Sequence, residues 1–188
     1  MTMILLRPAA VVLSLLAAPS ALAQDRHHFP PAPYAGFESR SIKSLSDEQV
    51  ADLKAGRGMG LALAAELNGY PGPLHVLELA DRLGLTAGQR SRVQELLDGM
   101  RAETVPLGER LIEQEAELDR MFASKTATPE GIAAATQAIG ATQGALRAAH
   151  LKYHLTTAAL LTPHQVAQYG RLRGYGGGHR PGHGGHRG

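Results

Sequence analysis

The sequence predicts an all-α protein built on a long antiparallel helical hairpin with shorter flanking helices. Two separate segments, 85–89 and 161–165, share the pattern Leu-Thr-x-x-Gln, and each precedes residues with helical periodicity. Helix-favouring Ala, Leu, Glu, Gln and Arg are common, whereas aromatic residues make up only 4% of the chain. No run of alternating β-branched residues predicts a strand. These three observations together favour helix over sheet throughout.

The first 23 residues have the three parts of a cleaved export signal. Arg7 supplies a positive charge, residues 9–18 form an apolar run too short to span a bilayer, and residues 21–23 read Ala-Leu-Ala, a pattern that signal peptidase cleaves. We therefore expect a mature chain that begins near Gln24, is located in the periplasm and retains no membrane span.

Composition limits the classes of protein that fit. The chain has no cysteine, which excludes disulfides, thiolate metal sites and c-type haem attachment. Without Arg7 the chain has 18 basic and 17 acidic residues, a formal charge of +1 with histidine neutral. Such a balance argues against a nucleic-acid-binding protein, which normally has a basic face.

A helical domain is expected over residues 46–173, after a flexible proline-rich arm over residues 24–45. Ser46 and Gln49 form a candidate capping box at its start. The helix that begins there either continues through the glycines at 56–60 or breaks at them, because glycine inside a helix costs roughly 1 kcal/mol relative to alanine. The sequence leaves both possibilities open.

The two Leu-Thr-x-x-Gln segments are expected to begin helices. In each, the threonine oxygen accepts a hydrogen bond from an N–H group of the first turn, and the glutamine three residues later reaches back to the threonine N–H. The resulting capping boxes are Thr86 with Gln89 and Thr162 with Gln165. Each contributes roughly 1 kcal/mol to helix stability.

The remaining helices follow from apolar spacing. A short helix is expected over residues 75–83. A long one runs from the first capping box to about Phe122, with a bend at Pro106. Its apolar seam consists of Val93, Leu97, Met100, Thr104, Leu107, Leu111, Gln114, Leu118 and Met121. After a loop over residues 123–128, a second long helix has a seventh-residue repeat of Ile132, Ile139, Leu146, Tyr153 and Leu160. Two such helices suit antiparallel packing at a shallow angle, and the amino-terminal helices or a second subunit must cover their seams.

Known enzyme signatures are absent from the sequence. Residues 56–60 read Gly-Arg-Gly-Met-Gly, which is not a dinucleotide-binding pattern, and neither a phosphate-binding loop nor a Gly-x-Ser-x-Gly elbow occurs. His150 and His154 have the spacing of a zinc-protease helix, but leucine replaces the glutamate that would act as general base. We expect no enzymatic activity and no nucleotide cofactor.

His150 and His154 are the best metal-ligand candidates. Histidines four apart lie on one helix face, so both imidazoles can bind one Zn²⁺ or Ni²⁺ ion, with His75, Glu78, water or a second chain completing the site. The alternative is structural, because His150 also follows the spacing of the apolar seam. The sequence leaves both interpretations open.

The carboxyl-terminal residues 174–188 are rich in glycine and are expected to be disordered. They carry His179, His183 and His186, which form a weaker candidate metal site because ordering the segment costs conformational entropy and the nearby arginines repel a cation. A tail without function is the alternative.

The charged surface of the first long helix permits two interpretations. Residues 109–120 combine many acidic side chains with a few basic ones beside the apolar seam. A solvated helix face explains this most simply. A mixed surface of this kind also suits reversible binding of unfolded proteins without ATP.

Taken together, the export signal, the two Leu-Thr-x-x-Gln segments and the long hairpin resemble the Spy/CpxP family of periplasmic proteins over roughly residues 46–172. The histidine-bearing tail is similar to the zinc-resistance-associated branch of that family, which also includes heavy-metal sensors. The resemblance implies an all-helical protein that is commonly a cradle-shaped antiparallel homodimer. It also implies histidine ligands on the amino-terminal helix and the last long helix, to which His75, His150 and His154 loosely correspond.

From this resemblance we expect a metal-binding envelope-stress protein with holdase-type chaperone activity toward unfolded or misfolded envelope proteins. The alternative is a heavy-metal-sensing regulator that acts on a membrane-bound kinase or anti-sigma partner.

Overall fold

The computed structural model describes residues 32–175, and every regular element among them is helical. The chain divides into two units, residues 1–35 and 36–188. Only residues 32–35 of the first unit are described, and they form a turn. The second unit contains all the described helices. The expected export signal and the tail histidines lie outside the described residues.

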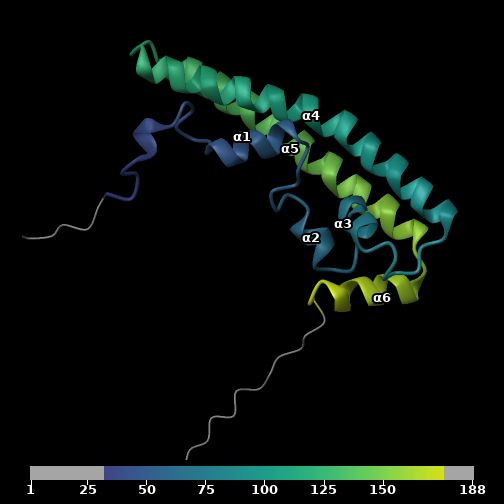
Figure 1. Cartoon of the computed structure of the whole chain (residues 1–188). Coiled ribbons are helices and arrows are strands. Elements are labelled where there is room, and N and C mark those ends of the chain that lie inside the picture. The colour runs from purple at the N-terminus through teal and green to yellow at the C-terminus, as the bar shows by residue number, and fades with distance from the viewer. Residues whose placement is uncertain (1–31, 176–188) are drawn as a thin grey trace, which may run out of the picture. The chain divides into compact units, whose positions relative to one another are not determined.

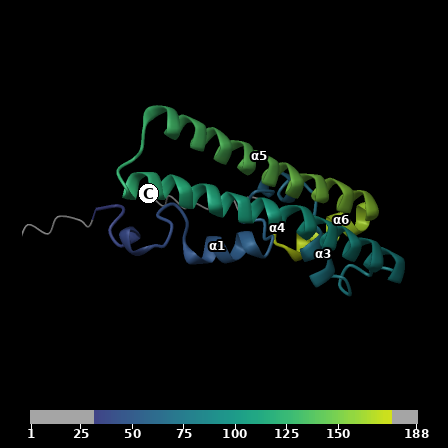
Figure 2. The same cartoon turned by 90° about the horizontal axis from the view of Figure 1, so that it is seen from above.

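The second unit is a long helical hairpin with short helices packed against it (Figure 1). Its elements are η1 (Phe37–Ser39), α1 (Asp47–Lys54), α2 (Leu63–Glu66), α3 (Pro73–Glu78), α4 (Ala87–Ala123), α5 (Pro129–Leu160) and α6 (Pro163–Leu172). Helices α4 and α5 lie side by side (Figure 2), α1 packs on α4, α2 on α5, and α3 on both. The prediction of an all-α fold with a long helix pair is confirmed, and the α4–α5 turn lies where the sequence placed it.

The amino-terminal helix begins as predicted but is short. The Ser46 hydroxyl accepts from the Gln49 N–H at 3.1 Å, and the Gln49 side chain accepts from the Ser46 N–H at 2.8 Å. Packed structure extends a few residues further upstream, into the segment expected to be a flexible arm. Ile42 is only 8% exposed and forms an isolated bridge with Leu45, because its apolar side chain finds a place in the core.

The chain breaks at the glycines after α1, which settles the question that the sequence left open. Gly56, Met59 and Gly60 have φ angles of +63°, +42° and +81°, which no α-helix can contain. A Cβ on Gly56 would also lie 2.7 Å from the Thr104 hydroxyl oxygen. Gly56 therefore lies directly on α4, at the start of residues 56–60, which are called the glycine loop below.

Helix α4 continues through Pro106 and meets α1 at a glycine. A Cβ on Gly108 would lie 2.5 Å from the Leu53 carbonyl oxygen, so the two backbones are in contact. Along the predicted seam, the residues up to Leu111 are mostly buried, whereas Gln114, Leu118 and Met121 are partly exposed. The short helices thus cover the first two thirds of α4. A second subunit over the remainder stays a prediction.

The two Leu-Thr-x-x-Gln segments form their capping boxes and also contact each other. The side chain of Gln89 donates to that of Gln165 at 2.9 Å, and Gln165 donates back at 3.1 Å. The same amides donate to the carbonyl groups of Leu160 and Leu83, respectively. The repeated motif therefore joins the start of α4 to the start of α6 across more than 70 residues of sequence.

Candidate metal centre

A cavity of about 340 Å³ lies between the glycine loop, α3 and the middle of the hairpin. His75, His150 and His154 all line it, so the structure brings together three of the four predicted ligands. His150 and His154, called the cavity histidines below, lie one turn apart on α5 and are 2% and 9% exposed. The prediction that they share one face is confirmed.

The hydrogen bonds of His154 determine which ring nitrogen is available. Its Nδ1 lies 2.7 Å from the Tyr70 carbonyl oxygen, and because a carbonyl can only accept, Nδ1 carries the proton. In the neutral ring, Nε2 then has a free lone pair. A Cβ on Gly72 would lie 2.7 Å from this Nε2, so Gly72 packs closely on the ring and any side chain there would obstruct the nitrogen. Metal-binding histidines commonly have this arrangement, with the second nitrogen donating to a carbonyl.

His150 is a buried imidazole that lacks a hydrogen-bond partner at one nitrogen. Among the described residues, nothing bonds to its buried Nε2. An unpaired buried polar atom costs roughly 1–3 kcal/mol, so such an atom requires an explanation. Burial, aided by the nearby charge of His154, lowers the pKa of His150. The ring is therefore neutral at neutral pH and has a lone pair for an ion.

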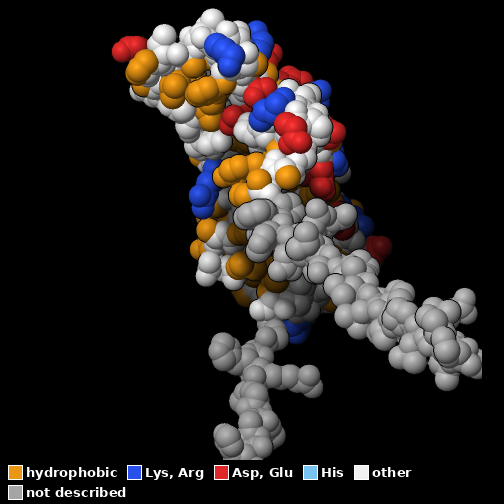
Figure 3. Space-filling model, turned by 90° about the vertical axis from the view of Figure 1, so that its left-hand side faces the viewer, with side chains coloured by type: hydrophobic (Ala, Val, Ile, Leu, Met, Phe, Trp, Pro, Cys, Tyr) orange, Lys and Arg blue, Asp and Glu red, His pale blue; other side chains and the backbone are white. Residues whose placement is uncertain are grey.

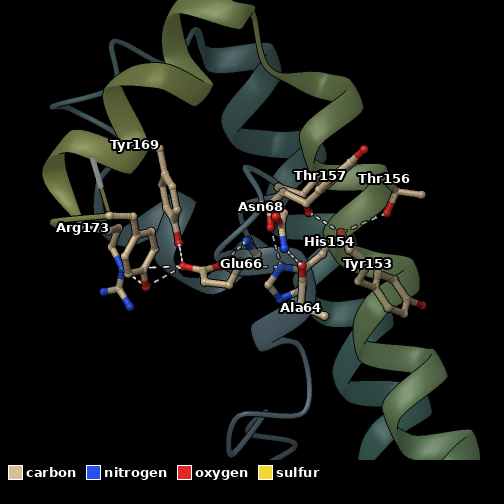
Figure 4. A network of polar contacts seen from close by, with 12 residues as sticks. Ala64, Glu66, Asn68, Tyr153, His154, Thr156, Thr157, Tyr169 and Arg173 are labelled. Carbon is tan, nitrogen blue, oxygen red and sulfur yellow. Dashed lines mark hydrogen bonds and ion pairs between the residues drawn. The ribbon is translucent and has the colours of Figure 1, made fainter. Parts of the chain in front are cut away.

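A buried carboxylate lies beside His154 and bonds to side chains of α6 and of the residues just after it (Figure 4). Glu66, on α2, accepts hydrogen bonds from the hydroxyl groups of Tyr169 and Tyr175 and from the Gly72 N–H. Its carboxylate also lies 3.6 Å from Nδ1 of His154 and forms an ion pair with Arg173 at 3.7 Å. Both carboxylate oxygens are thus in use, so Glu66 supports the cavity wall.

The Tyr169 hydroxyl is held protonated for this role. Burial, together with the hydrogen bond to Glu66, raises the pKa of Tyr169. Sequence reasoning missed Glu66, because a single glutamate in a four-residue helix belongs to no pattern.

The other predicted ligands are arranged differently. His75 Nδ1 and Glu78 Oε2 lie 2.7 Å apart and bond to each other on the exposed side of α3. His75 still lines the cavity, but Glu78 does not, so the expectation that it joins the histidines is not met. Within residues 32–175, no group of three or more His, Cys, Asp or Glu side chains is placed to hold a metal ion. Any third protein ligand must come from another residue type or another segment.

Two methionines also line the cavity. Met100, on α4, is 6% exposed, and Met59, in the glycine loop, is 41% exposed. The left-handed conformation of Met59, with φ +42°, costs a residue with a side chain roughly 1–3 kcal/mol. The sequence placed Met100 on the apolar seam of α4 and did not single out Met59.

The surface outside the cavity is of mixed character. Figure 3 shows acidic, basic and hydrophobic side chains interspersed on the face that it displays. Several large apolar side chains near the cavity are exposed, with Leu63, Leu67 and Leu155 each more than half accessible. No helix among the described residues is both long enough and apolar enough to cross a membrane.

Comparison with known proteins gives one family match. Residues 60–168 match the family described as heavy-metal resistance, which is grouped with the Spy/CpxP-like proteins. The resemblance found in the sequence is confirmed at the level of this wider group. Neither the curated proteins nor the solved structures contain a match.

Proposed function

Because the chain belongs to the heavy-metal resistance family, we propose that it binds a transition-metal ion in the cavity, with the cavity histidines as ligands. The observation that carries this proposal is the pair of buried imidazoles one turn apart on α5. Each has a nitrogen without a hydrogen-bond partner among the described residues, and the His154 tautomer directs a lone pair toward the cavity. Water can complete the coordination.

A metal titration tests this proposal. The purified protein is titrated with Zn²⁺ and Ni²⁺ by calorimetry, alongside His150→Ala, His154→Ala and the double variant. His164→Ala is the matched control, because His164 is exposed on α6 and does not line the cavity. We expect the double variant to lose the site and the control to retain it. Unchanged affinity in the double variant would remove the proposal.

The tail histidines offer a second place for an ion, and the same titration separates the two. Replacing His179, His183 and His186 with alanine leaves the cavity intact. We expect the tail variant to lose only weak binding, because flexible ligands must be ordered when they bind. A tail variant that loses all binding would place the site in the tail instead.

We further propose a periplasmic location and a holdase-type role toward unfolded envelope proteins. The exposure of Leu63, Leu67 and Leu155 supports this role, because exposed apolar side chains can bind apolar segments of other proteins. Suppression of the aggregation of a denatured client by the purified protein, without ATP, is the measurement.

The control for the holdase role is a variant in which these three leucines are replaced by serine. We expect it to lose suppression while retaining its helix content. An absence of suppression with and without metal would favour the alternative, a sensor that regulates a membrane-bound kinase or anti-sigma partner.

A further inference from the structure

The cavity is lined by two methionines in addition to the imidazoles. Met100 is held in its wall by packing between α4 and α5. A Cβ on the preceding residue, Gly99, would lie 3.1 Å from the hydroxyl oxygen of Tyr153, which lies between the two cavity histidines on α5. Met100 is therefore level with both imidazoles along the hairpin.

Met59 lines the cavity from the glycine loop. A Cβ on its neighbour Gly58 would lie 3.6 Å from Nδ1 of His150, so the glycine loop packs directly on that imidazole. The loop has φ > 0 at three positions, and two of them are glycine. Met59 is the third, and a residue with a side chain is held there despite the unfavourable backbone conformation. A sulfur that binds a ligand would explain why a methionine, rather than a glycine, occupies this position.

We propose that the cavity selects a soft monovalent cation, Cu(I) or Ag(I), through the sulfur atoms of Met59 and Met100 together with the cavity histidines. This inference rests on the proposed metal-binding function and names the class of ion. Thioether sulfur is a soft donor, and together with imidazole it favours Cu(I) over harder divalent ions.

Charge favours the same class of ion. Neither thioether carries a charge, burial keeps His150 neutral, and Glu66 already accepts hydrogen bonds at both oxygens. Among the described residues, no further carboxylate or histidine completes a three-ligand set of the kind that suits a divalent ion. A single positive charge in this partly buried site therefore needs less compensation than a double one.

Competition titrations test the selectivity. Cu(I) affinity is measured by competition with a chromogenic chelator under anaerobic, reducing conditions. Ag(I) binding and Zn²⁺ binding are each measured by calorimetry. The variants are Met59→Leu and Met100→Leu, which preserve side-chain volume. Met121→Leu is the control, because Met121 lies at the far end of α4 beside Gly131. X-ray absorption at the copper edge reports sulfur in the coordination shell directly.

We expect Cu(I) and Ag(I) to bind more tightly than Zn²⁺ in the wild type. Each cavity methionine variant should weaken Cu(I) at least tenfold and remove sulfur scattering, with Zn²⁺ affinity and the melting temperature nearly unchanged. Metal binding by the cavity histidines with no effect of either methionine variant would overturn this inference and leave the proposed function intact. Failure of every ion to bind would overturn both.

Discussion

Replacing Gly72 with alanine should block the metal site without removing any proposed ligand. The new Cβ would lie 2.7 Å from Nε2 of His154, whereas ordinary van der Waals contact begins at 3.4 Å. The imidazole must therefore move by at least about 0.7 Å, away from the Tyr70 carbonyl that orients it, or the methyl group remains in the path of the ion. A metal bound to imidazole at about 2.0–2.1 Å has no room beside such a methyl group.

We expect Gly72→Ala to have a large effect on metal affinity and a small effect on the free energy of unfolding. Loss of an orienting contact of this kind typically reduces metal affinity about 10–100-fold, or roughly 1.4–2.7 kcal/mol. The lost hydrogen bond costs roughly 0.5–1.5 kcal/mol of folding free energy. Replacing glycine with alanine also stabilises the fold by about 0.4–1 kcal/mol, because alanine lowers the conformational entropy of the unfolded chain. The backbone angles of Gly72, φ −85° and ψ 154°, suit any residue before a proline. The melting temperature should therefore change little.

The assay is metal titration of the wild type and Gly72→Ala, with thermal melting followed by circular dichroism. Gly140→Ala is the matched control, since a Cβ there meets nothing within 4 Å. It should bind metal normally and gain up to roughly 1 kcal/mol from helix propensity. Wild-type affinity in Gly72→Ala would refute the reasoning, because Nε2 of His154 would then not be a ligand.

Three further predictions concern stability, each measured by chemical denaturation of the metal-free protein. Gly108→Ala should destabilise by about 1–3 kcal/mol, because its Cβ would meet the Leu53 carbonyl oxygen at 2.5 Å; a stabilised variant would contradict that contact. Gln89→Ala and Gln165→Ala should show a coupling energy of about 0.5–3 kcal/mol in a double-mutant cycle, and additive effects would argue against their mutual hydrogen bonds. Acidification should destabilise the wild type but not His150→Phe. The pKa of His150 is lowered in the fold, so the unfolded chain binds the extra proton below pH about 6.5 and stability falls progressively below that pH. Parallel pH profiles of both proteins would contradict this.

Features that depend on local interactions could be predicted from the sequence. The capping boxes at Ser46, Thr86 and Thr162 each involve residues three apart, and all three form. The apolar periods predicted the two long helices and their loop, because helix geometry converts spacing into a face. The same reasoning predicted that His150 and His154 lie on one face of a helix. Each of these features depends on residues that are close in the chain.

The remaining features were decided by contacts between residues far apart. Gln89 and Gln165 were recognised as caps, but their bonds to each other depend on the fold bringing α6 back to the start of α4. Glu66 carried no signal, because the two tyrosines that donate to it lie on α6 and just after it, more than 100 residues later.

The availability of the two histidines was also decided by the tertiary structure. Whether a buried histidine keeps a free lone pair depends on the groups that surround its ring, such as the Tyr70 carbonyl and Gly72 at His154. The sequence by itself determined the helices and the pairing of His150 with His154, because both follow from helix geometry. Only the tertiary structure placed those imidazoles, the Glu66 carboxylate and two methionines around one cavity, because burial and hydrogen bonding depend on neighbours in space.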